Sequence, residues 1–310
     1  MAQPRPVRER TQYLLCRLQT RGGPAVNDAP SAWEKEIQSG ERFGFGQNWT
    51  AFLRMLDEDR ITSAEGSLRD MLGRGSLEGL SFLDAGSGSG LLSLAARRFG
   101  ATVHSFDYDP YSVACTAELK RRCFPDDARW TVEQGSVLDQ AFLARLGTFD
   151  IVYSWGVLHH TGAMWQALEN VGPLVAIGGQ LFIAIYNDQG WASDLWKAVK
   201  RTYVSAPAFV KPAITLLSFA RLWGPTMLRD ICLGHPLRSW RTYADQPRAR
   251  GMHPWRDVVD WVGGYPFEVA RPNEVVDFYR HRGLEVQRTS TCGRGLGCNE
   301  FVFLRTKKIA

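Results

Sequence analysis

The segment FLDAGSGSG (residues 82–90) places an aspartate and three alternating glycines between an apolar run and an amphipathic stretch. A glycine loop lets backbone amides approach a ligand closely, because no side chain stands in the way. Gly86, Gly88 and Gly90 follow Asp84 with the spacing Asp-x-Gly-x-Gly-x-Gly. A dinucleotide fingerprint needs its third glycine where this chain has Leu91, and pyrophosphate disfavours a nearby carboxylate. The loop therefore argues against a nicotinamide oxidoreductase.

Three carboxylates match the parts of one cofactor. Asp84 can balance an ammonium group, because a partly buried cation needs a counter-charge. Asp107 ends an apolar run and can accept both hydroxyls of a ribose. Asp139, in the segment GSVLD with Ser136 and Val137, is placed to meet an adenine edge. These groups predict S-adenosylmethionine as the cofactor, with S-adenosylhomocysteine as the product.

The elements that position these residues alternate from residue 80 onward between short apolar strands and amphipathic helices, which is typical of a parallel α/β sheet. We expect strands at 80–86, 102–107, 129–135, 149–155, 180–187, 284–289 and 300–305. The last two are joined by a glycine-rich loop too short for a crossover helix, so they must pair antiparallel. The predicted fold is α/β: a Rossmann-like seven-stranded sheet with strand 7 antiparallel and an α-rich insertion between strands 5 and 6.

Four regions follow from this pattern. Residues 1–78 form an N-terminal helical segment that closes the cofactor pocket with Trp49, and residues 79–190 form the cofactor-binding core. Residues 191–271 form a helical lid over the substrate, and residues 272–310 complete the core with a helix and the final hairpin.

The catalytic candidates follow the fourth and fifth strands, whose carboxyl ends meet at the ligand-binding edge of such a sheet. An oxygen acceptor with a high pKa needs a base, and histidine titrates in the useful range. We expect His159 to be the base, with His160 as the second candidate and Asp188 assisting. The alternatives are packing or cofactor contact for the histidines and helix capping for Asn187 and Asp188. Adjacent histidines lack the spacing of a ligand pair, so no metal site is predicted.

Substrate contacts are expected from three segments at the same edge. Tyr186 and Asn187 leave the fifth strand, and Trp261 and Tyr265 lie in the segment WVGGYPFE of the lid. The loop between the last two strands adds Arg294 and Asn299. The lid aromatics can equally form the core of the lid.

Composition sets the remaining limits. The chain has 310 residues, of which 45% are hydrophobic and 22% charged, as in an ordinary globular protein. Its net charge of +5 is uneven, with ten Lys or Arg against three Asp or Glu in residues 191–250. That segment either attracts an anionic acceptor or is a solvated basic face.

With no apolar run of roughly 20 residues, no signal peptide and no Cys-x-x-Cys pair among six cysteines, we expect a cytoplasmic protein without a transmembrane segment. No sequence feature indicates the oligomeric state.

The segments FLDAGSGSG, SFDYDP, GSVLD and FDIVYSWGVLHH, in this order, resemble the class I S-adenosylmethionine-dependent methyltransferases. The similarity is closer to the small-molecule branch that includes the ubiquinone- and menaquinone-biosynthesis enzymes, and it covers about residues 80–190 and the final hairpin. It implies cofactor contacts from Asp84, Gly86, Ser87, Gly88, Gly90, Asp107, Tyr108, Ser136, Val137, Asp139 and Ser154.

The sequence predicts methyl transfer to a small molecule, at oxygen and with an anionic acceptor. An RNA or tRNA methyltransferase using residues 191–250 is the first alternative, but the stretch SWGVLHH lacks the Asn/Asp-Pro-Pro-Tyr/Phe motif of enzymes acting on exocyclic base amines. A second alternative is a lipid or quinone methyltransferase whose run at 213–228 docks on a membrane, although a helix of the lid core explains the same run. A third is a protein that binds the cofactor without turnover.

Overall fold

The computed structural model describes residues 31–46, 49, 53, 56–245, 254–293 and 295–307. The chain divides into two units, residues 1–35 and residues 36–310. Helix α2 (Ala32–Gln38) begins in the first unit and ends in the second. The second unit holds the whole sheet.

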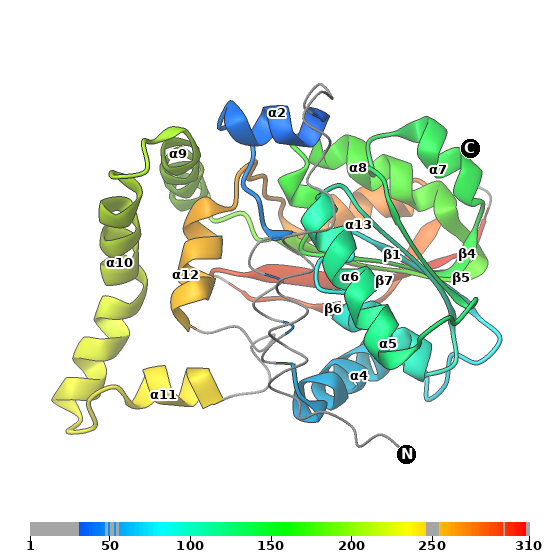
Figure 1. Ribbon diagram of the computed structural model, residues 1–310, viewed down its shortest axis with the longest axis horizontal. Helices are drawn as coiled ribbons and strands as arrows, with labels where there is room; N and C mark the ends of the chain where they lie inside the picture. Colours follow the sequence, from blue (N-terminus) through cyan, green and yellow to red (C-terminus); the bar gives the residue numbers. More distant parts are fainter. Residues whose placement is uncertain are drawn as a thin grey trace, which may run out of the picture. The chain divides into compact units, whose positions relative to one another are not determined.

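A seven-stranded sheet forms the centre of the second unit (Figure 1). Its strands are β1 (Ser81–Ala85), β2 (Thr102–Asp107), β3 (Trp130–Gln134), β4 (Phe149–Trp155), β5 (Val175–Tyr186), β6 (Leu284–Ser290) and β7 (Cys298–Arg305). They lie in the order β3-β2-β1-β4-β5-β7-β6. The first five pair in parallel, and β7 runs antiparallel to both β5 and β6. The predicted Rossmann-like sheet with a reversed strand 7 is confirmed.

Helices cover both faces of the sheet (Figure 1). One face carries α4 (Glu58–Leu72), α5 (Leu91–Arg98) and α6 (Pro110–Cys123), and the other carries α7 (Gln140–Leu146), α8 (Met164–Val171) and α13 (Pro272–Arg280). Local sequence explains where these helices begin. Asp109 caps α6 by accepting the Tyr111 amide at 2.9 Å, with Pro110 at the first helical position.

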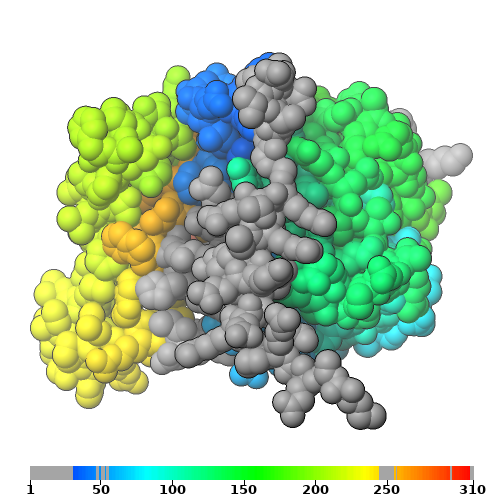
Figure 2. All heavy atoms as spheres, viewed as in Figure 1, coloured from blue at the N-terminus to red at the C-terminus, as the bar shows by residue number. Residues whose placement is uncertain are grey.

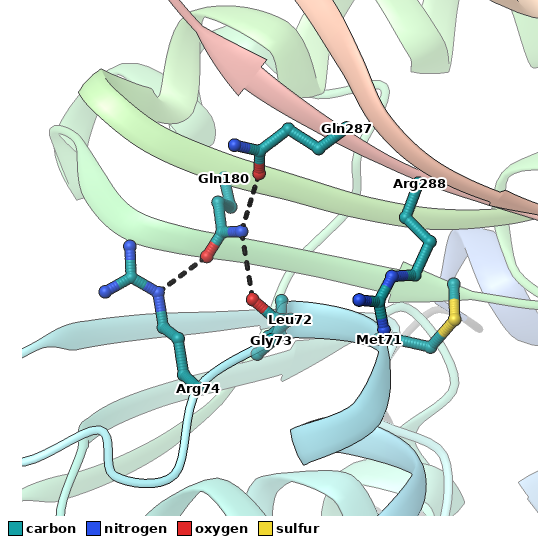
Figure 3. A pocket seen from close by; sticks show the side chains of 7 residues that line it. All are labelled: Met71, Leu72, Gly73, Arg74, Gln180, Gln287 and Arg288. Atoms are coloured by element: carbon teal, nitrogen blue, oxygen red, sulfur yellow. Dashed lines mark hydrogen bonds between the residues drawn. The ribbon is translucent and has the colours of Figure 1, made fainter.

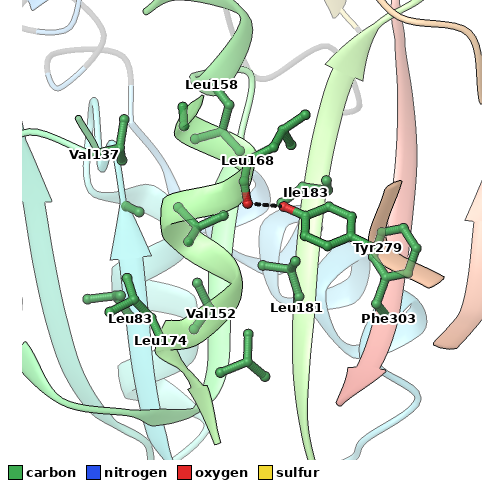
Figure 4. Packing of buried hydrophobic residues seen from close by; sticks show 14 of the residues in the cluster. Leu83, Val137, Val152, Leu158, Leu168, Leu174, Leu181, Ile183, Tyr279 and Phe303 are labelled. Atoms are coloured by element: carbon green, nitrogen blue, oxygen red, sulfur yellow. Dashed lines mark hydrogen bonds between the residues drawn. The ribbon is translucent and has the colours of Figure 1, made fainter. Parts of the chain in front are cut away.

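The hydrophobic core lies on both sides of the sheet. On the side of α8 and α13, leucines, valines and phenylalanines of the strands pack against the helices (Figure 4). Tyr279 of α13 is fully buried there, and its hydroxyl donates to the Leu168 carbonyl oxygen of α8 at 2.9 Å. The polar end of this large side chain is therefore satisfied inside the core.

The predicted α-rich insertion between β5 and β6 is confirmed. It contains α9 (Trp191–Ser205), α10 (Lys211–Cys232), α11 (Arg238–Asp245) and α12 (Pro254–Gly263), and α12 lies between α10 and the sheet (Figure 1). Tyr203, Val204, Val258 and Val262 are buried in a small core of their own. Within the described ranges, no helix is both long and apolar enough to cross a membrane.

The strand order places the ligand-binding edge. The chain leaves β1 for β2 on one side, whereas β4 pairs on the other side of β1. In open α/β sheets, ligands bind outside the carboxyl ends of the strands at such a reversal. The loops after β1, β2 and β4 should therefore form the site.

Candidate active site

The glycine loop after β1 is held by the end of β2. The amides of Gly86 and Ser87 both donate to the Phe106 carbonyl oxygen, at 2.8 and 3.0 Å. The Gly88 amide donates to Asp107 Oδ2 at 2.9 Å. The sequence predicted that the glycine loop and the Asp107 carboxylate act together, and a hydrogen bond joins them directly.

Two glycines of this loop are sterically required. Gly86 has a φ of 90°, and a Cβ built there would lie 2.4 Å from Val157 Cγ1, in the turn after β4. A Cβ on Gly88 would lie 3.2 Å from the indole ring of Trp49. The loop therefore packs between the end of β4 and Trp49, the residue expected to close the cofactor pocket.

Asp84 lies at the end of a buried hydrogen-bond chain. Its side chain is 1% exposed and accepts the Ser93 hydroxyl of α5, which is 2.7 Å from the Ser105 hydroxyl. The Trp130 indole N–H donates to that Ser105 hydroxyl at 2.9 Å. Burial raises the pKa of Asp84 to about 7, although the Ser93 hydrogen bond opposes the shift.

Asp107 also carries a raised pKa. Burial raises the pKa of its carboxyl group to about 6, against the lowering effect of the Gly88 and Asp109 amides that donate to it. Neither Asp84 nor Asp107 forms an ion pair with a basic side chain in the described ranges. A buried carboxylate, Asp84, and a half-buried one, Asp107, thus flank the glycine loop without an ion-pair partner in the described ranges.

The N-terminal segment is fastened to the same edge. The Gly46 amide donates to Asp109 Oδ2 at 2.8 Å, and the Arg42 guanidinium lies 5.0 Å from the centre of the Tyr108 ring. Arg42 also donates to the carbonyl oxygen of His160 at 2.9 Å. Residues 42–46 therefore connect the end of β2 with the turn after β4.

Several other predicted cofactor residues have structural partners. Asp139 caps α7 by accepting the Phe142 amide at 3.0 Å, and Ser136 Oγ accepts the Leu138 amide at 3.1 Å. Ser154 is fully buried and donates to the Ala85 carbonyl oxygen at 2.7 Å, which ties β4 to β1. Val137 is buried beside them, and cofactor contact by these residues stays a prediction.

The two histidines lie in a short 3-10 helix (Leu158–His160) directly after β4. The His159 ring is fully buried, and its Nδ1 accepts the Tyr186 amide at 3.4 Å. His160 Nδ1 lies 2.6 Å from the Pro266 carbonyl oxygen. A carbonyl only accepts, so this Nδ1 carries the proton, and the neutral ring of His160 keeps its lone pair on Nε2. The neighbouring histidines therefore have opposite tautomers.

Aromatic side chains of the lid complete this corner. The Tyr186 ring centre lies 3.9 Å from that of His159, 5.3 Å from that of Trp261 and 5.4 Å from that of Phe267. The predicted residues Tyr186 and Trp261 are thus in contact, and the Tyr186 ring centre also lies 5.3 Å from that of His160. Tyr265 lies nearby in sequence, and its carbonyl oxygen accepts the Phe43 amide at 2.9 Å.

Two of the polar residues predicted to contact the substrate, Asn187 and Asn299, form a hydrogen bond with each other. Asn299 Nδ2 donates to Asn187 Oδ1 at 3.0 Å, and Asn187 Nδ2 donates to the Gly293 carbonyl oxygen at 3.0 Å. This pair fixes the loop after β6 against the end of β5. Asp188 Oδ1 accepts the Gly190 amide at 2.8 Å just before α9, and its Oδ2 faces Arg271 Nε at 3.3 Å. Arg294 lies outside the described residues.

Lys200 is a titratable residue that the sequence reasoning missed. It lies fully buried on α9, its Nζ donates to the Trp261 carbonyl oxygen, and burial lowers its pKa to about 7. The signal was present: position 200 falls with Trp196, Tyr203 and Val204 on one face of the helix, where an apolar residue is expected.

A polar hollow of about 390 Å³ lies toward the amino ends of the strands, away from the glycine loop. It is lined by Met71, Leu72, Gly73, Arg74, Gln180, Gln287 and Arg288 (Figure 3). Gln180 joins its walls, accepting from Arg74 Nε at 2.7 Å and donating to Gln287 Oε1 at 2.8 Å. Arg74 and Arg288 point to different sides of the hollow in Figure 3, so they do not converge on one ligand.

The described residues contain no group of three or more His, Cys, Asp or Glu side chains able to hold a metal ion. In the same ranges, Cys115, Cys123, Cys232, Cys292 and Cys298 are free thiols.

Comparison with known proteins identifies the core of this site. Residues 83–181 match the family model described as a methyltransferase domain. This part of the chain is similar to methyltransferase domains. The match runs from β1 to the middle of β5 and so includes the glycine loop, Asp107 and both histidines. The resemblance to the class I S-adenosylmethionine-dependent methyltransferases is confirmed for this part of the chain.

Curated relatives match parts of the chain. A ubiquinone biosynthesis O-methyltransferase of Methylocella silvestris is 34% identical over 137 residues, which are 44% of this chain and 51% of that protein. A ribosomal protein L11 methyltransferase of Xanthomonas campestris is 36% identical over 102 residues, 32% of this chain and 29% of that protein. The chain thus spans about half the length of the first relative and less of the second.

One solved structure shares the fold, and a second aligns less well. An O-methyltransferase family protein from Burkholderia thailandensis aligns with a TM-score of 0.50 at 14% identity, covering 96% of this chain and 71% of that one. A magnesium protoporphyrin IX methyltransferase from Synechocystis PCC 6803, solved with S-adenosylhomocysteine, aligns with a TM-score of 0.46 at 16% identity, covering 95% and 94%.

Proposed function

We propose that this chain transfers a methyl group from S-adenosylmethionine to a small-molecule acceptor. One observation carries the proposal: the buried carboxylate of Asp84 and the half-buried carboxylate of Asp107 flank the glycine loop of the segment that matches a methyltransferase domain, and neither has a basic partner in the described ranges. A buried carboxylate is costly unless a cation or hydrogen bonds compensate it. A cofactor with an ammonium group and a ribose offers both.

Residues at the carboxyl ends of the strands would each contact a different part of the cofactor. Asp84 would balance the ammonium group, Asp107 would accept from the ribose hydroxyls, and the adenine would lie near Tyr108 and the segment 136–139. The bound cofactor supplies a methyl group already activated on a sulfonium sulfur. The chain contributes position, because alignment of acceptor, methyl and sulfur removes much of the barrier.

The tautomers of the two histidines favour His160 over His159 as the catalytic base. The sequence alone favours His159 as the first candidate. The Pro266 carbonyl fixes the proton of His160 on Nδ1, so Nε2 can accept a proton from an acceptor hydroxyl. In His159 the Nδ1 lone pair is already turned toward the Tyr186 amide. Asp188 already accepts the Gly190 amide and faces Arg271, so we propose only an indirect role for it.

We further propose that the methyl group is transferred to an oxygen atom and that the acceptor molecule is negatively charged. We also propose that the protein works in the reducing cytoplasm. A relative named an O-methyltransferase favours oxygen, and the basic lid favours an anion. Tyr186, Trp261 and Tyr265 would meet the body of the acceptor, whereas the Asn187–Asn299 pair would shape the loop beside it.

The test has two steps. Calorimetric titration should detect binding of S-adenosylmethionine, and Asp107→Ala should weaken it at least tenfold, whereas Asp150→Ala, a carboxylate bonded to Ser81 at the opposite ends of the strands, should not. Methyl-labelled cofactor is then incubated with cell extract separated into small-molecule, lipid, RNA and protein fractions. Label in the small-molecule fraction that disappears with Asp107→Ala supports the proposal.

Other outcomes decide against it. Label in RNA would favour an RNA methyltransferase, label in the lipid fraction would favour a lipid or quinone acceptor, and label in protein would favour a protein acceptor. Cofactor binding with no label in any fraction would favour a protein that binds without turnover. Absence of binding would overturn the cofactor assignment itself.

A further inference from the structure

Helix α10 exposes a continuous apolar stripe. Leu217, Leu228 and Ile231 are 73%, 62% and 60% exposed, and Leu216 beside them is 61% exposed. Positions 213, 217, 220, 224, 228 and 231 hold Ala, Leu, Ala, Gly, Leu and Ile and are separated by three or four residues, so they share one face of the helix. Leu233, just after the helix, and Phe209, just before it, are 63% and 84% exposed. The stripe therefore runs along the whole of α10.

The lid core does not explain this stripe. The opposite side of α10 packs inward through Phe219, Leu222 and Trp223, and it also buries the polar residues Thr215 and Asp230. Thr215 donates to the Lys211 carbonyl oxygen, and Asp230 accepts the amide and hydroxyl of Ser239. Polar groups are thus satisfied inside the lid while leucines face outward. An ordinary amphipathic lid helix shows the reverse arrangement.

Positive charge is common on the exposed surface of the lid that carries the stripe. In residues 191–243 the exposed cations are Lys197, Arg201, Arg221, Arg229, Arg238 and Arg241, and the exposed carboxylate of that range is Asp194. Arg221 lies within the stripe itself, four residues after Leu217. Figure 2 shows this part of the chain at the surface, from olive for α9 to yellow for α11.

We propose that the outer face of α10 docks the protein on an anionic lipid bilayer. Exposed leucines enter the boundary between headgroups and acyl chains, and flanking cations meet the anionic headgroups. A symmetric contact between two copies would bring these like charges together, because the same patch meets itself. A nucleic acid would use the arginines but leave the leucines exposed to water. An anionic bilayer satisfies both features.

Vesicle flotation tests the surface without any cofactor, so it can fail while methyl transfer succeeds. The protein should float with vesicles of phosphatidylcholine and phosphatidylglycerol, and at least tenfold less with phosphatidylcholine alone. The double variant Leu217→Glu/Leu228→Glu should lower partition at least tenfold, and Arg221→Glu/Arg229→Glu should do so on the anionic vesicles only. Ile177→Glu is the matched control, because Ile177 is 61% exposed and lies in the amino-terminal part of β5. It should partition as the unchanged protein does.

Folding of each variant is checked by its melting temperature and by binding of S-adenosylmethionine. The proposal is overturned if the unchanged protein stays with the soluble fraction at every lipid composition. It is also overturned if Ile177→Glu loses partition as much as the α10 variant. If the protein forms a dimer in the absence of lipid and Leu217→Glu/Leu228→Glu abolishes it, the stripe is a contact between two copies of the chain. If the protein binds RNA and not vesicles, the cations serve a nucleic acid. Either result would overturn the proposal.

Discussion

Lys200 holds its ammonium nitrogen 4.2 Å from the centre of the Trp261 ring while it donates a hydrogen bond to the Trp261 carbonyl oxygen. Phe267 presents a second ring at 4.8 Å. No carboxylate of the described ranges lies within ion-pair distance of this amine, so burial dominates and lowers its pKa to about 7, although the charge of Asp260 opposes the shift. The lysine joins α9 to the aromatic corner of the candidate active site.

This lysine should make stability depend on pH. Its pKa falls from 10.5 to about 7 on folding, so between these values the unfolded chain binds a proton that the folded protein lacks. The free energy of unfolding should therefore rise with pH from about 7 to about 10, by roughly 1.4 kcal/mol per pH unit from this group. Urea titrations at several pH values should show the rise, and Lys200→Met should remove it. An unchanged slope in Lys200→Met would assign the dependence to other groups.

In the protein without cofactor, Asp84 should make the free energy of unfolding change with pH in the opposite direction. Its pKa is raised from 3.8 to about 7, so the folded protein retains a proton that the unfolded chain has lost. Stability should fall as pH rises from about 4 to about 7, by roughly 1.4 kcal/mol per pH unit, and Asp84→Asn should remove this fall.

Cofactor affinity should follow the ionisation of Asp84. A bound ammonium group favours the carboxylate form, so affinity should increase as pH rises from 6 to 7 in the unchanged protein. Calorimetric titration with S-adenosylmethionine checks this, with Asp84→Asn as the comparison. Equal pH dependence in the two proteins would remove Asp84 from the ammonium site.

The Asn187–Asn299 pair should be energetically coupled. Both side chains are buried, and either alanine substitution leaves buried polar groups without a partner, at a cost of about 2 kcal/mol. A double-mutant cycle with Asn187→Ala and Asn299→Ala should give a coupling energy of about 1 kcal/mol. Additive single effects would show that the two residues act independently.

The sequence predicted the parts of this fold whose cause is local. Apolar runs identified all seven strands. The glycine loop and Asp107 were expected at one edge, and they are bonded there because a parallel sheet brings its carboxyl ends together.

What the sequence did not predict depends on tertiary contacts. Asn187 and Asn299 are 112 residues apart, and only the pairing of β7 with β5 brings them together. The tautomer of His160 depends on the Pro266 carbonyl, 106 residues away. An apolar run at 213–228 could not show that α10 turns leucines outward, because hydrophobicity on all sides leaves the packed face undefined.

Gly264 is a glycine of the lid that should tolerate substitution poorly. It follows α12, and a Cβ built there would lie 3.0 Å from His160 Cε1 and 3.3 Å from Phe45 Cζ. Gly264→Ala should therefore lower the free energy of unfolding by about 1–3 kcal/mol through overpacking and should reduce methyl transfer by displacing the His160 ring. Gly224→Ala is the matched control, because Gly224 lies within α10 with no atom within 4 Å of a built Cβ, and alanine there should stabilise the helix by up to about 1 kcal/mol. Urea titration and the labelled-cofactor assay measure both effects. If Gly264→Ala is as stable and active as Gly224→Ala, the close approach of the lid to His160 does not govern the site.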